Sequence, residues 1–230
     1  MTIGIIGAMD EEIERLKAAM DPCEEQAIAG CLFFKGDLEG REAVVVKSGI
    51  GKVNAAIATT LLIEHYQPEY VINTGSAGGF HKDLDVGDIV ISTEVRYHDV
   101  DVTSSGYEYG QIPQLPPAFI ADDKLIKAAV RAADEVPEVR VTEGLIATGD
   151  SFMSDADRVA FVTSKFPELL AAEMEGAAIA QTCSRFEVPF VIIRSLSDIA
   201  GKDSEVSFNQ FLHKAAKHSA TVVHHMLKEI

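Results

Sequence analysis

The sequence is short of cysteine and of basic residues. Its three cysteines, Cys23, Cys31 and Cys183, are odd in number and form no CxxC pair, which favours a reducing, cytoplasmic compartment. Twenty Lys and Arg face 36 Asp and Glu, so the formal net charge is −16. Because affinity for nucleic acid comes largely from basic side chains on phosphates, this balance argues against a nucleic-acid partner.

Long apolar runs are also missing. The first apolar stretch, residues 3–9, has no basic flank and precedes three acids, so we expect neither a signal peptide nor a membrane span. No linker rich in Pro, Gly or Ser divides the 230 residues, and no internal repeat is evident. With 47% hydrophobic residues the chain can fill a sizeable core, so we expect one domain over residues 1–230.

Apolar strands alternate with helical patterns along the chain. Strands are expected at residues 3–8, 31–38, 42–47, 70–74, 88–93, 141–148 and 190–193. Helices are expected at residues 10–20, 52–66 and 122–133, in the small-residue segment led by Glu173 and Glu175, and from a capping box at 207–210 almost to 230. Residues 31–47 read as a β-hairpin. The pattern predicts an α/β fold with a mixed β-sheet flanked by helices.

Several nucleotide and hydrolase motifs are absent. Gly4 and Gly7 follow the pattern GxxG, not GxGxxG, so a dinucleotide site is weakly supported, and no GxxxxGK[ST] phosphate loop occurs. Neither Ser76 nor Ser151 stands in a GxSxG elbow, which argues against a serine hydrolase.

The seven histidines do not have the spacing of metal ligands. His98 and the pair His224-His225 are more simply explained as surface or capping residues. We therefore expect no metal site.

Carboxylates stand where elements are expected to begin or end. Asp198 follows the apolar run 190–193, and ligands of open α/β sheets bind at the carboxyl ends of strands. Glu12 lies in the first turn of a helix and shares a face with Leu16, while Glu175 leads the small-residue helix. Singly, each could be a helix-dipole or loop residue. Two carboxylates that lead a helix, Glu173 and Glu175, and one that ends a buried strand, Asp198, together suggest acid–base chemistry on an uncharged, hydroxyl-bearing substrate.

Two further features have an ordinary and a functional interpretation. The segment 75–79 would by default be a tight turn that breaks the strand, but its glycines would also let backbone N–H groups approach a ligand. Phe152 and Phe208 are by default core residues, and the alternative is a ring that stacks on a planar base.

The joint pattern resembles the 5′-methylthioadenosine/S-adenosylhomocysteine nucleosidases. The motifs that carry this resemblance are GIIGAMDEE at 4–12, KSGIGKV at 47–53, NTGSAGG at 73–79, DVTSSGYEYG at 101–110, AEME at 172–175 and SLSD at 195–198. They stand in the family's order and cover essentially the whole chain. The resemblance implies a nucleoside phosphorylase-like fold, a homodimer, and no metal or organic cofactor.

The resemblance also implies a reaction. The expected activity is hydrolysis of the N-glycosidic bond of methylthioadenosine, adenosylhomocysteine and 5′-deoxyadenosine, yielding adenine and a 5′-modified ribose in methionine salvage and the recycling of adenosylmethionine by-products. The motifs do not rank these substrates against one another or against a futalosine-like nucleoside.

Residue roles follow from the same resemblance. Glu12 would activate water and Asp198 would donate a proton to adenine N7. The implied substrate-binding residues are Glu175 for the ribose hydroxyls, Met174, Gly78 and Met153 around the nucleoside, Phe152 on the adenine, Ser76 and Arg194 near the water, Ser197 beside Asp198, and Ile50, Val102 and Phe208 at the 5′-thio pocket. The irregular segment 102–118 would help to close the site across the dimer. Family members often carry an aromatic residue where this chain has Ser105.

Two alternatives remain open at this point. A phosphorolytic enzyme of the same fold would use phosphate in place of water; the acids at 10–12 argue against it, but Lys47, Lys52 and Arg194 could bind the anion. A non-catalytic nucleoside sensor would need the pocket without the three acids.

Overall fold

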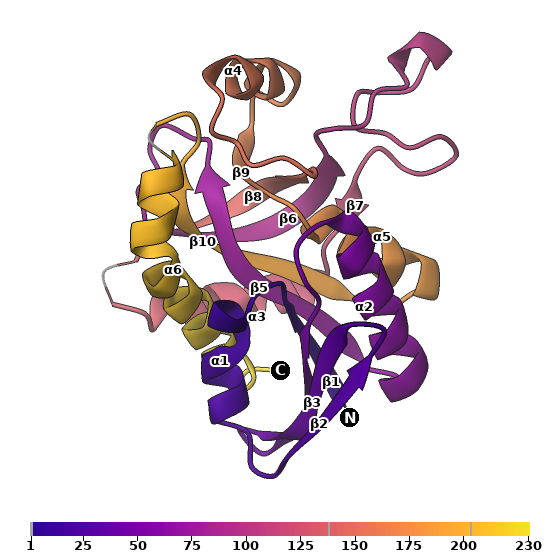
Figure 1. The fold of residues 1–230 in the computed structure, drawn as a ribbon, viewed down its shortest axis with the longest axis vertical. Helices are drawn as coiled ribbons and strands as arrows, with labels where there is room; N and C mark the ends of the chain where they lie inside the picture. The colour runs from indigo at the N-terminus through magenta and orange to yellow at the C-terminus, as the bar shows by residue number, and fades with distance from the viewer. Residues whose placement is uncertain (1, 138, 203) are drawn as a thin grey trace.

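The computed structural model describes residues 2–137, 139–202 and 204–230 (Figure 1). Its strands are β1 (Thr2–Gly7), β2 (Cys23–Ile28), β3 (Cys31–Leu38), β4 (Arg41–Lys47), β5 (Tyr70–Gly79), β6 (Ile89–Tyr97), β7 (Phe119–Ile120), β8 (Val141–Thr148), β9 (Leu169–Glu173) and β10 (Phe190–Ile199). Its helices are α1 (Asp10–Ala18), α2 (Lys52–Tyr66), α3 (Asp123–Asp134), α4 (Ala156–Lys165), α5 (Gly176–Phe186) and α6 (Ser204–Met226), with a short 3₁₀ turn η1 (Thr103–Ser105). None of the described helices combines the length and apolarity needed to cross a bilayer.

The strands form one mixed sheet that closes on itself at one end. β1 pairs in parallel with β4 and β5, and the antiparallel strands β3 and β2 continue the sheet beyond β4. At the other end, pairings β5–β10, β10–β6, β6–β8, β8–β9 and β9–β5 complete a ring. This confirms the expected mixed α/β architecture, in which the ring brings the carboxyl ends of β5 and β10 beside β9.

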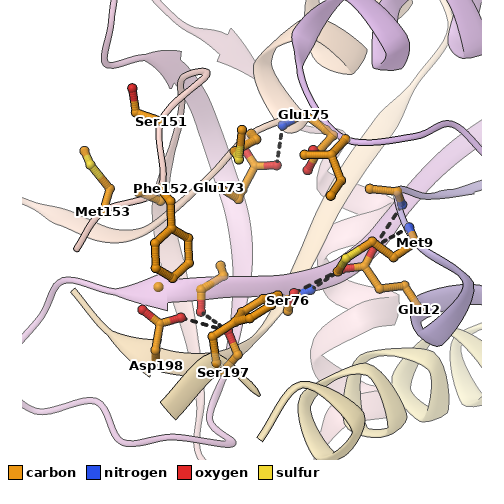
Figure 2. A pocket seen from close by; sticks show the side chains of 17 residues that line it. Met9, Glu12, Ser76, Ser151, Phe152, Met153, Glu173, Glu175, Ser197 and Asp198 are labelled. Atoms are coloured by element: carbon orange, nitrogen blue, oxygen red, sulfur yellow. Dashed lines mark hydrogen bonds between the residues drawn. The ribbon is translucent and has the colours of Figure 1, made fainter. Parts of the chain in front are cut away.

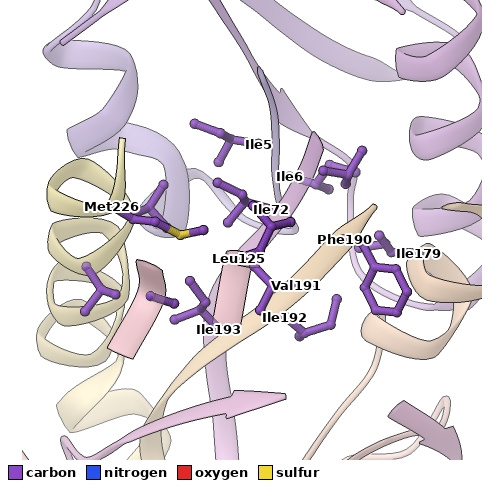
Figure 3. Packing of buried hydrophobic residues seen from close by; sticks show 14 of the residues in the cluster. Ile5, Ile6, Ile72, Leu125, Ile179, Phe190, Val191, Ile192, Ile193 and Met226 are labelled. Atoms are coloured by element: carbon purple, nitrogen blue, oxygen red, sulfur yellow. The ribbon is translucent and has the colours of Figure 1, made fainter. Parts of the chain in front are cut away.

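Helices cover both faces of the sheet. In Figure 1, α1, α3 and α6 lie on one side of the sheet, and α2 and α5 lie on the other. The core between these layers consists of β-branched and aliphatic side chains that are fully excluded from solvent, such as Ile5 and Ile72 on the central strands and Ile192 on β10 (Figure 3). Such continuous apolar runs are typical of parallel strands that are buried on both faces.

Three strands run beyond the ranges taken from the sequence pattern: β5, β10, and β6, which continues past residue 93 to Tyr97. The segment 75–79 does not break β5 as expected: it continues the strand and pairs with β10 from Arg194 to Ile199, with one register shift between Leu196 and Asp198. Likewise β10 continues past the apolar run 190–193 through its polar residues to Ile199, so Asp198 stands near the end of a buried strand, as expected. The break expected at 75–79 was wrong because glycine and polar residues were read as the end of a strand, whereas here they are paired strand residues.

Two helix starts also differ from expectation. Glu173 does not lead a helix but is the last residue of β9, a strand that the sequence analysis missed, and Glu175 is the N-cap residue of α5. The last helix begins at Ser204, not at a capping box around Ser207, whose hydroxyl donates instead to the carbonyl of Ser197 at 3.0 Å. The sequence also gave no indication of β2, β7 or α4.

Candidate active site

A cavity of about 230 Å³ opens where β5, β9 and β10 meet the first turn of α1 (Figure 2). Of the residues expected in the site, those that line it are Glu12, Ile50, Ser76, Gly78, Phe152, Met153, Met174, Glu175, Ser197, Asp198 and Phe208. Among the described residues, Arg194 and Val102 were expected there and do not line it. The lining residues that were not expected in the site are Ala8, Met9, Ala77, Ser151 and Ala172, while Glu173 was expected as an acid but not as a substrate ligand. All of these residues except Ser151 stand inside the motifs at 4–12, 73–79 and 172–175, and this position is the signal that could have found them.

Glu12 is held at one end of the cavity by four hydrogen bonds. Its Oε2 accepts the N–H groups of Ala8 (2.8 Å) and Met9 (3.3 Å), and its Oε1 accepts the N–H (2.9 Å) and the hydroxyl (3.1 Å) of Ser76. The side chain is buried on the same face of α1 as Leu16, as the sequence predicted. Four donors around an acceptor-only group fix the orientation of the carboxylate towards the cavity.

Asp198 lies at the other end of the cavity, below the Phe152 ring (Figure 2). A register shift in the β5–β10 pairing leaves Ser197 as an extra residue between Leu196 and Asp198. Neighbouring residues of a regular strand face opposite sides, whereas this bulge lets both Ser197 and Asp198 line the cavity. The Ser197 hydroxyl donates to Asp198 Oδ1 at 2.9 Å. Burial raises the pKa of Asp198, and hydrogen bonds from Ser197 and Ser204 oppose the increase only in part.

The glycines of β5 let both carboxylates approach the strand. A methyl group on Gly75 would lie 2.6 Å from Oε1 of Glu12, and one on Gly78 would lie 3.1 Å from Oδ2 of Asp198. The functional interpretation of the segment 75–79 therefore has a physical basis, although the groups that approach its backbone are the protein's own carboxylates.

Glu175 stands on the wall beside α2. Its Oε1 accepts the N–H of Gly51 at 2.8 Å, and its Oε2 lies 3.8 Å from Nη2 of Arg194. Burial, followed by the charge of nearby Glu173, raises the pKa of Glu175 to about 8, and Arg194 offsets part of the increase.

Glu173 and Arg194 form a buried ion pair behind this wall. Arg194 Nη2 donates to Oε2 of Glu173 at 2.5 Å and to Oδ1 of Asn73 at 2.6 Å. The same Glu173 oxygen accepts the N–H groups of Glu175 (3.0 Å) and Gly176 (2.7 Å), and so caps α5. Arg194 therefore contacts the carboxylates of the wall and not the cavity itself.

The cavity is strongly acidic. Four carboxylates line it, from Glu12, Glu173, Glu175 and Asp198, and no Lys or Arg does so among the described residues. The cations considered as anion ligands are each paired with an acid: Lys47 with Asp10 (2.9 Å), Lys52 with Asp99 (2.6 Å) and Arg194 with Glu173. This charge distribution disfavours a phosphate dianion and suits a neutral or cationic ligand.

The histidine prediction is only partly right. His98 is buried, not a surface residue, because its ring packs against Gly149, and burial lowers its pKa. His224 is half-buried and its Nε2 lies 2.7 Å from Glu39. In the parts of the chain that the structure describes, no three His, Cys, Asp or Glu side chains come together in a group that could hold a metal ion.

Known proteins share this sequence and this fold. The profile of the phosphorylase superfamily matches residues 2–228. A 5′-methylthioadenosine/S-adenosylhomocysteine nucleosidase of Bacillus pumilus is 59% identical over 229 residues, which cover 100% of this chain and 99% of the relative.

Solved structures agree with the sequence matches. A nucleosidase of the same name from Colwellia psychrerythraea 34H, in complex with adenine, matches with a TM-score of 0.98 at 50% identity, covering 100% of this chain and 95% of that one. The enzyme from Neisseria meningitidis, in complex with methylthio-immucillin-A, matches with a TM-score of 0.97 at 48% identity, covering 100% and 99%.

The raised pKa of Asp198 leads us to expect a particular pH dependence of the folded state's stability. A folded state that holds this proton more tightly than the unfolded chain loses stability as pH rises from the ordinary Asp value of about 3.9 through the raised value. Asp198→Asn removes this titration and keeps an acceptor for Ser197. We therefore expect its melting temperature at pH 8 to exceed that of the wild type by at least ~2 °C, since about 1 kcal/mol shifts Tm by 2–4 °C in a chain of this size.

Calorimetric scans from pH 8 downward check this expectation. The gap between variant and wild type should close towards pH 4. A variant that is less stable than the wild type at pH 8, or a difference in melting temperature that does not depend on pH, would show that ionisation of the buried Asp198 carboxyl does not destabilise the fold.

Proposed function

The chain belongs to the phosphorylase superfamily and, within it, to the 5′-methylthioadenosine/S-adenosylhomocysteine nucleosidases, and on this premise we propose how its residues hydrolyse both nucleosides to adenine and a 5′-thioribose. The family resemblance and the nucleoside phosphorylase-like fold expected from the sequence are confirmed. Residues 1–230 act as one catalytic domain in this proposal.

One observation carries the proposal. Two buried carboxylates, Glu12 and Asp198, lie at opposite ends of one cavity and both approach the backbone of β5. Carboxylates on either side of a glycosidic bond are the usual means of splitting it, one activating water and the other protonating the leaving group. A binding protein that only senses nucleosides has no need of such a pair.

Asp198 serves the adenine. The base leaves poorly as an anion, so a proton delivered to N7 neutralises it while the C–N bond breaks. The raised pKa of Asp198 favours the protonated form that this step requires, and the Ser197 hydroxyl holds the carboxyl in place. Phe152 stacks on the adenine in this arrangement, and Gly78 and Met153 border the base.

Glu12 and Glu175 serve the sugar. As the bond breaks, the ribose gains oxocarbenium character, and the acidic cavity stabilises its positive charge. Glu175 accepts hydrogen bonds from the ribose hydroxyls beside Met174, and Glu12 takes the proton of the attacking water with Ser76 next to it. Arg194 acts through Glu173 and Glu175, which it contacts.

The 5′-thio group occupies the apolar side of the cavity. Ile50 and Phe208 line it there, and the Phe208 ring lies edge-on to Phe152 with a centroid separation of 5.7 Å. These side chains offer no charged partner, so the site accommodates 5′-deoxyadenosine as well as the two thioethers.

Hydrolysis is favoured over phosphorolysis by the charges of the site. We expect methylthioadenosine in phosphate-free buffer to give adenine and free 5′-methylthioribose, at a rate that added phosphate changes less than ~2-fold, because an acidic cavity does not concentrate a dianion. Chromatography of the products with and without phosphate makes the measurement. A sugar 1-phosphate, or a rate that depends on phosphate, would support the phosphorylase alternative.

Neutralising Asp198 and neutralising Glu12 should both lower the rate of hydrolysis, but the two losses should depend differently on the leaving base. Asp198→Asn and Glu12→Gln should each lower kcat by ~10²–10⁴-fold on adenine nucleosides, the usual range for acid–base assistance. A nucleoside whose base leaves without protonation at N7 should restore much of the rate of Asp198→Asn but not that of Glu12→Gln. Steady-state kinetics on both substrates decide: equal impairment of Asp198→Asn on the two would remove its role as the acid.

The protein acts as a homodimer in the cytoplasm in this proposal, and all three of its cysteines are free thiols. Three apolar side chains stand exposed at the start of α2 beside the cavity: Ile50 (51%), Val53 (70%) and Ile57 (40%). The segment 102–118 projects from the body of the molecule (Figure 1), so Val102 and Ser105 can reach the 5′ side of a partner's cavity.

A charged substitution among the exposed apolar residues at the start of α2 tests whether the protein forms the proposed dimer. Val53→Asp should sediment as a monomer and lose at least ~10-fold in kcat/KM, because a buried unpaired charge opposes association. Ile120→Asp, at an equally exposed apolar residue on β7, is the matched control and should stay dimeric and active. A fully active wild-type monomer at assay concentrations would contradict the proposed role of the dimer.

A further inference from the structure

A group of three charged side chains joins three segments beside the cavity. Lys52 begins α2, Asp99 follows β6, and Asp150 lies in the loop between β8 and α4. Lys52 Nζ donates to Oδ2 of Asp99 at 2.6 Å and lies 3.8 Å from Oδ2 of Asp150. We call these three residues the clasp.

Backbone groups make the clasp more than a pair of surface ion pairs. The Lys52 N–H donates to Oδ1 of Asp150 at 2.9 Å, and the Asp150 N–H donates to Oδ2 of Asp99 at 3.0 Å. Since the N-cap residue of α2, Gly51, has no side chain, Asp150 supplies the capping carboxylate from another segment. Exposed ion pairs contribute little alone, whereas bonds from charged acceptors to backbone donors fix the chain.

Asp99 is the anchored side of the clasp. The neighbouring His98 is buried, its N–H donates to the carbonyl of Thr148 at 2.8 Å, and its carbonyl accepts the hydroxyl of Tyr109 at 2.9 Å. Asp99 therefore stands on a backbone that is held by β8 and Tyr109, without α2 or the Asp150 side chain.

The other two segments reach the cavity directly. Asp150 immediately precedes Ser151, Phe152 and Met153, all of which line the cavity. On the α2 side, Ile50 lines the cavity, and the N–H of Gly51 binds Glu175. The N-terminus of α2 thus donates one N–H to the loop on the base side and one to the carboxylate on the sugar side.

We propose that the clasp is a positioning device for nucleoside binding, in which Asp150 and Asp99 lock the loop 151–153 against the start of α2 so that Phe152 and Glu175 are set at a fixed separation before the substrate enters. This inference rests on the proposed nucleosidase function. Lys52, Asp99 and Asp150 line no part of the cavity, so they act through the residues that do.

Removing the contacts of the clasp should weaken nucleoside binding more than it slows the chemical step. Asp150→Ala should raise the KM for methylthioadenosine and the dissociation constant for adenine by ~10-fold or more, the loss expected for charge-assisted hydrogen bonds, and lower kcat by less than ~3-fold. Asp150→Asn keeps an acceptor for the Lys52 N–H and should recover most of the affinity. Lys52→Met, which keeps that N–H but loses the ion pairs, should fall between the two.

Asp122→Ala is the matched control. Asp122 also caps a helix, accepting the N–H groups of Lys124 (2.9 Å) and Leu125 (3.1 Å) at the start of α3, and it does not line the cavity. Its loss should lower the melting temperature about as much as the loss of Asp150, and leave KM and adenine affinity within ~2-fold of the wild type.

Kinetics together with calorimetric titration of adenine separate the outcomes. If Asp150→Ala matches Asp122→Ala in KM and in adenine affinity, the clasp is only a helix cap and the proposal is overturned. If Asp150→Ala does not fold, the comparison of Asp150→Asn and Lys52→Met with the wild type decides in the same way. A wild type that binds adenine but releases none from methylthioadenosine would refute the nucleosidase function and leave the clasp test standing.

Discussion

The buried ion pair between Glu173 and Arg194 connects the strands on which the active site is built. Arg194 comes from β10 and donates to Asn73 on β5, while Glu173 ends β9 and accepts the hydroxyl of Thr148 from β8. Four strands of the ring, three of which line the cavity, are thus joined by side chains. A buried charge that loses its partner costs about 3–5 kcal/mol, so neither member of the pair can be exchanged alone without weakening this closure. Glu175, at the cap of α5, takes its position from the same pair.

Close approach to β5 is the second constraint. Glu12 and Asp198 come from elements at the two ends of the chain, and each presses a carboxylate oxygen towards a glycine, Gly75 or Gly78. A methyl group at Gly75 would displace the Glu12 carboxylate, and one at Gly78 would crowd the Asp198 carboxylate. The glycines also leave backbone N–H groups accessible, one of which, at Ser76, binds Glu12. Glycines in a paired strand therefore let the carboxylates of Glu12 and Asp198 lie close to the β5 backbone without the flexibility of a loop.

The sequence predicted the elements whose pattern is local and missed those that depend on partners. The apolar runs around Ile5 and Ile192 identify buried strands on their own. The polar end of β10 does not, because Arg194 is satisfied by residues far away in the chain, and only the fold shows that a strand can contain it. Ser207 has the spacing of a capping box, yet its hydroxyl bonds to Ser197, a tertiary contact that local pattern cannot reveal. The resemblance named most of the lining residues, but it could not place Arg194 behind the wall or Val102 away from this chain's own cavity.

Charge is the property that ties these constraints to the reaction. Burial weakens the hydration of Asp198 and Glu175 and raises the pKa of both carboxyl groups, and at Glu175 repulsion from Glu173 and Glu12 adds to the increase. A neutral nucleoside brings no charge to relieve this repulsion when it binds. The relief comes as the bond breaks, when the sugar becomes cationic and the base accepts a proton. In the proposed mechanism the interaction is therefore strongest in the transition state, where stabilisation raises the rate, and the same acidic cavity disfavours the phosphate that would divert the sugar.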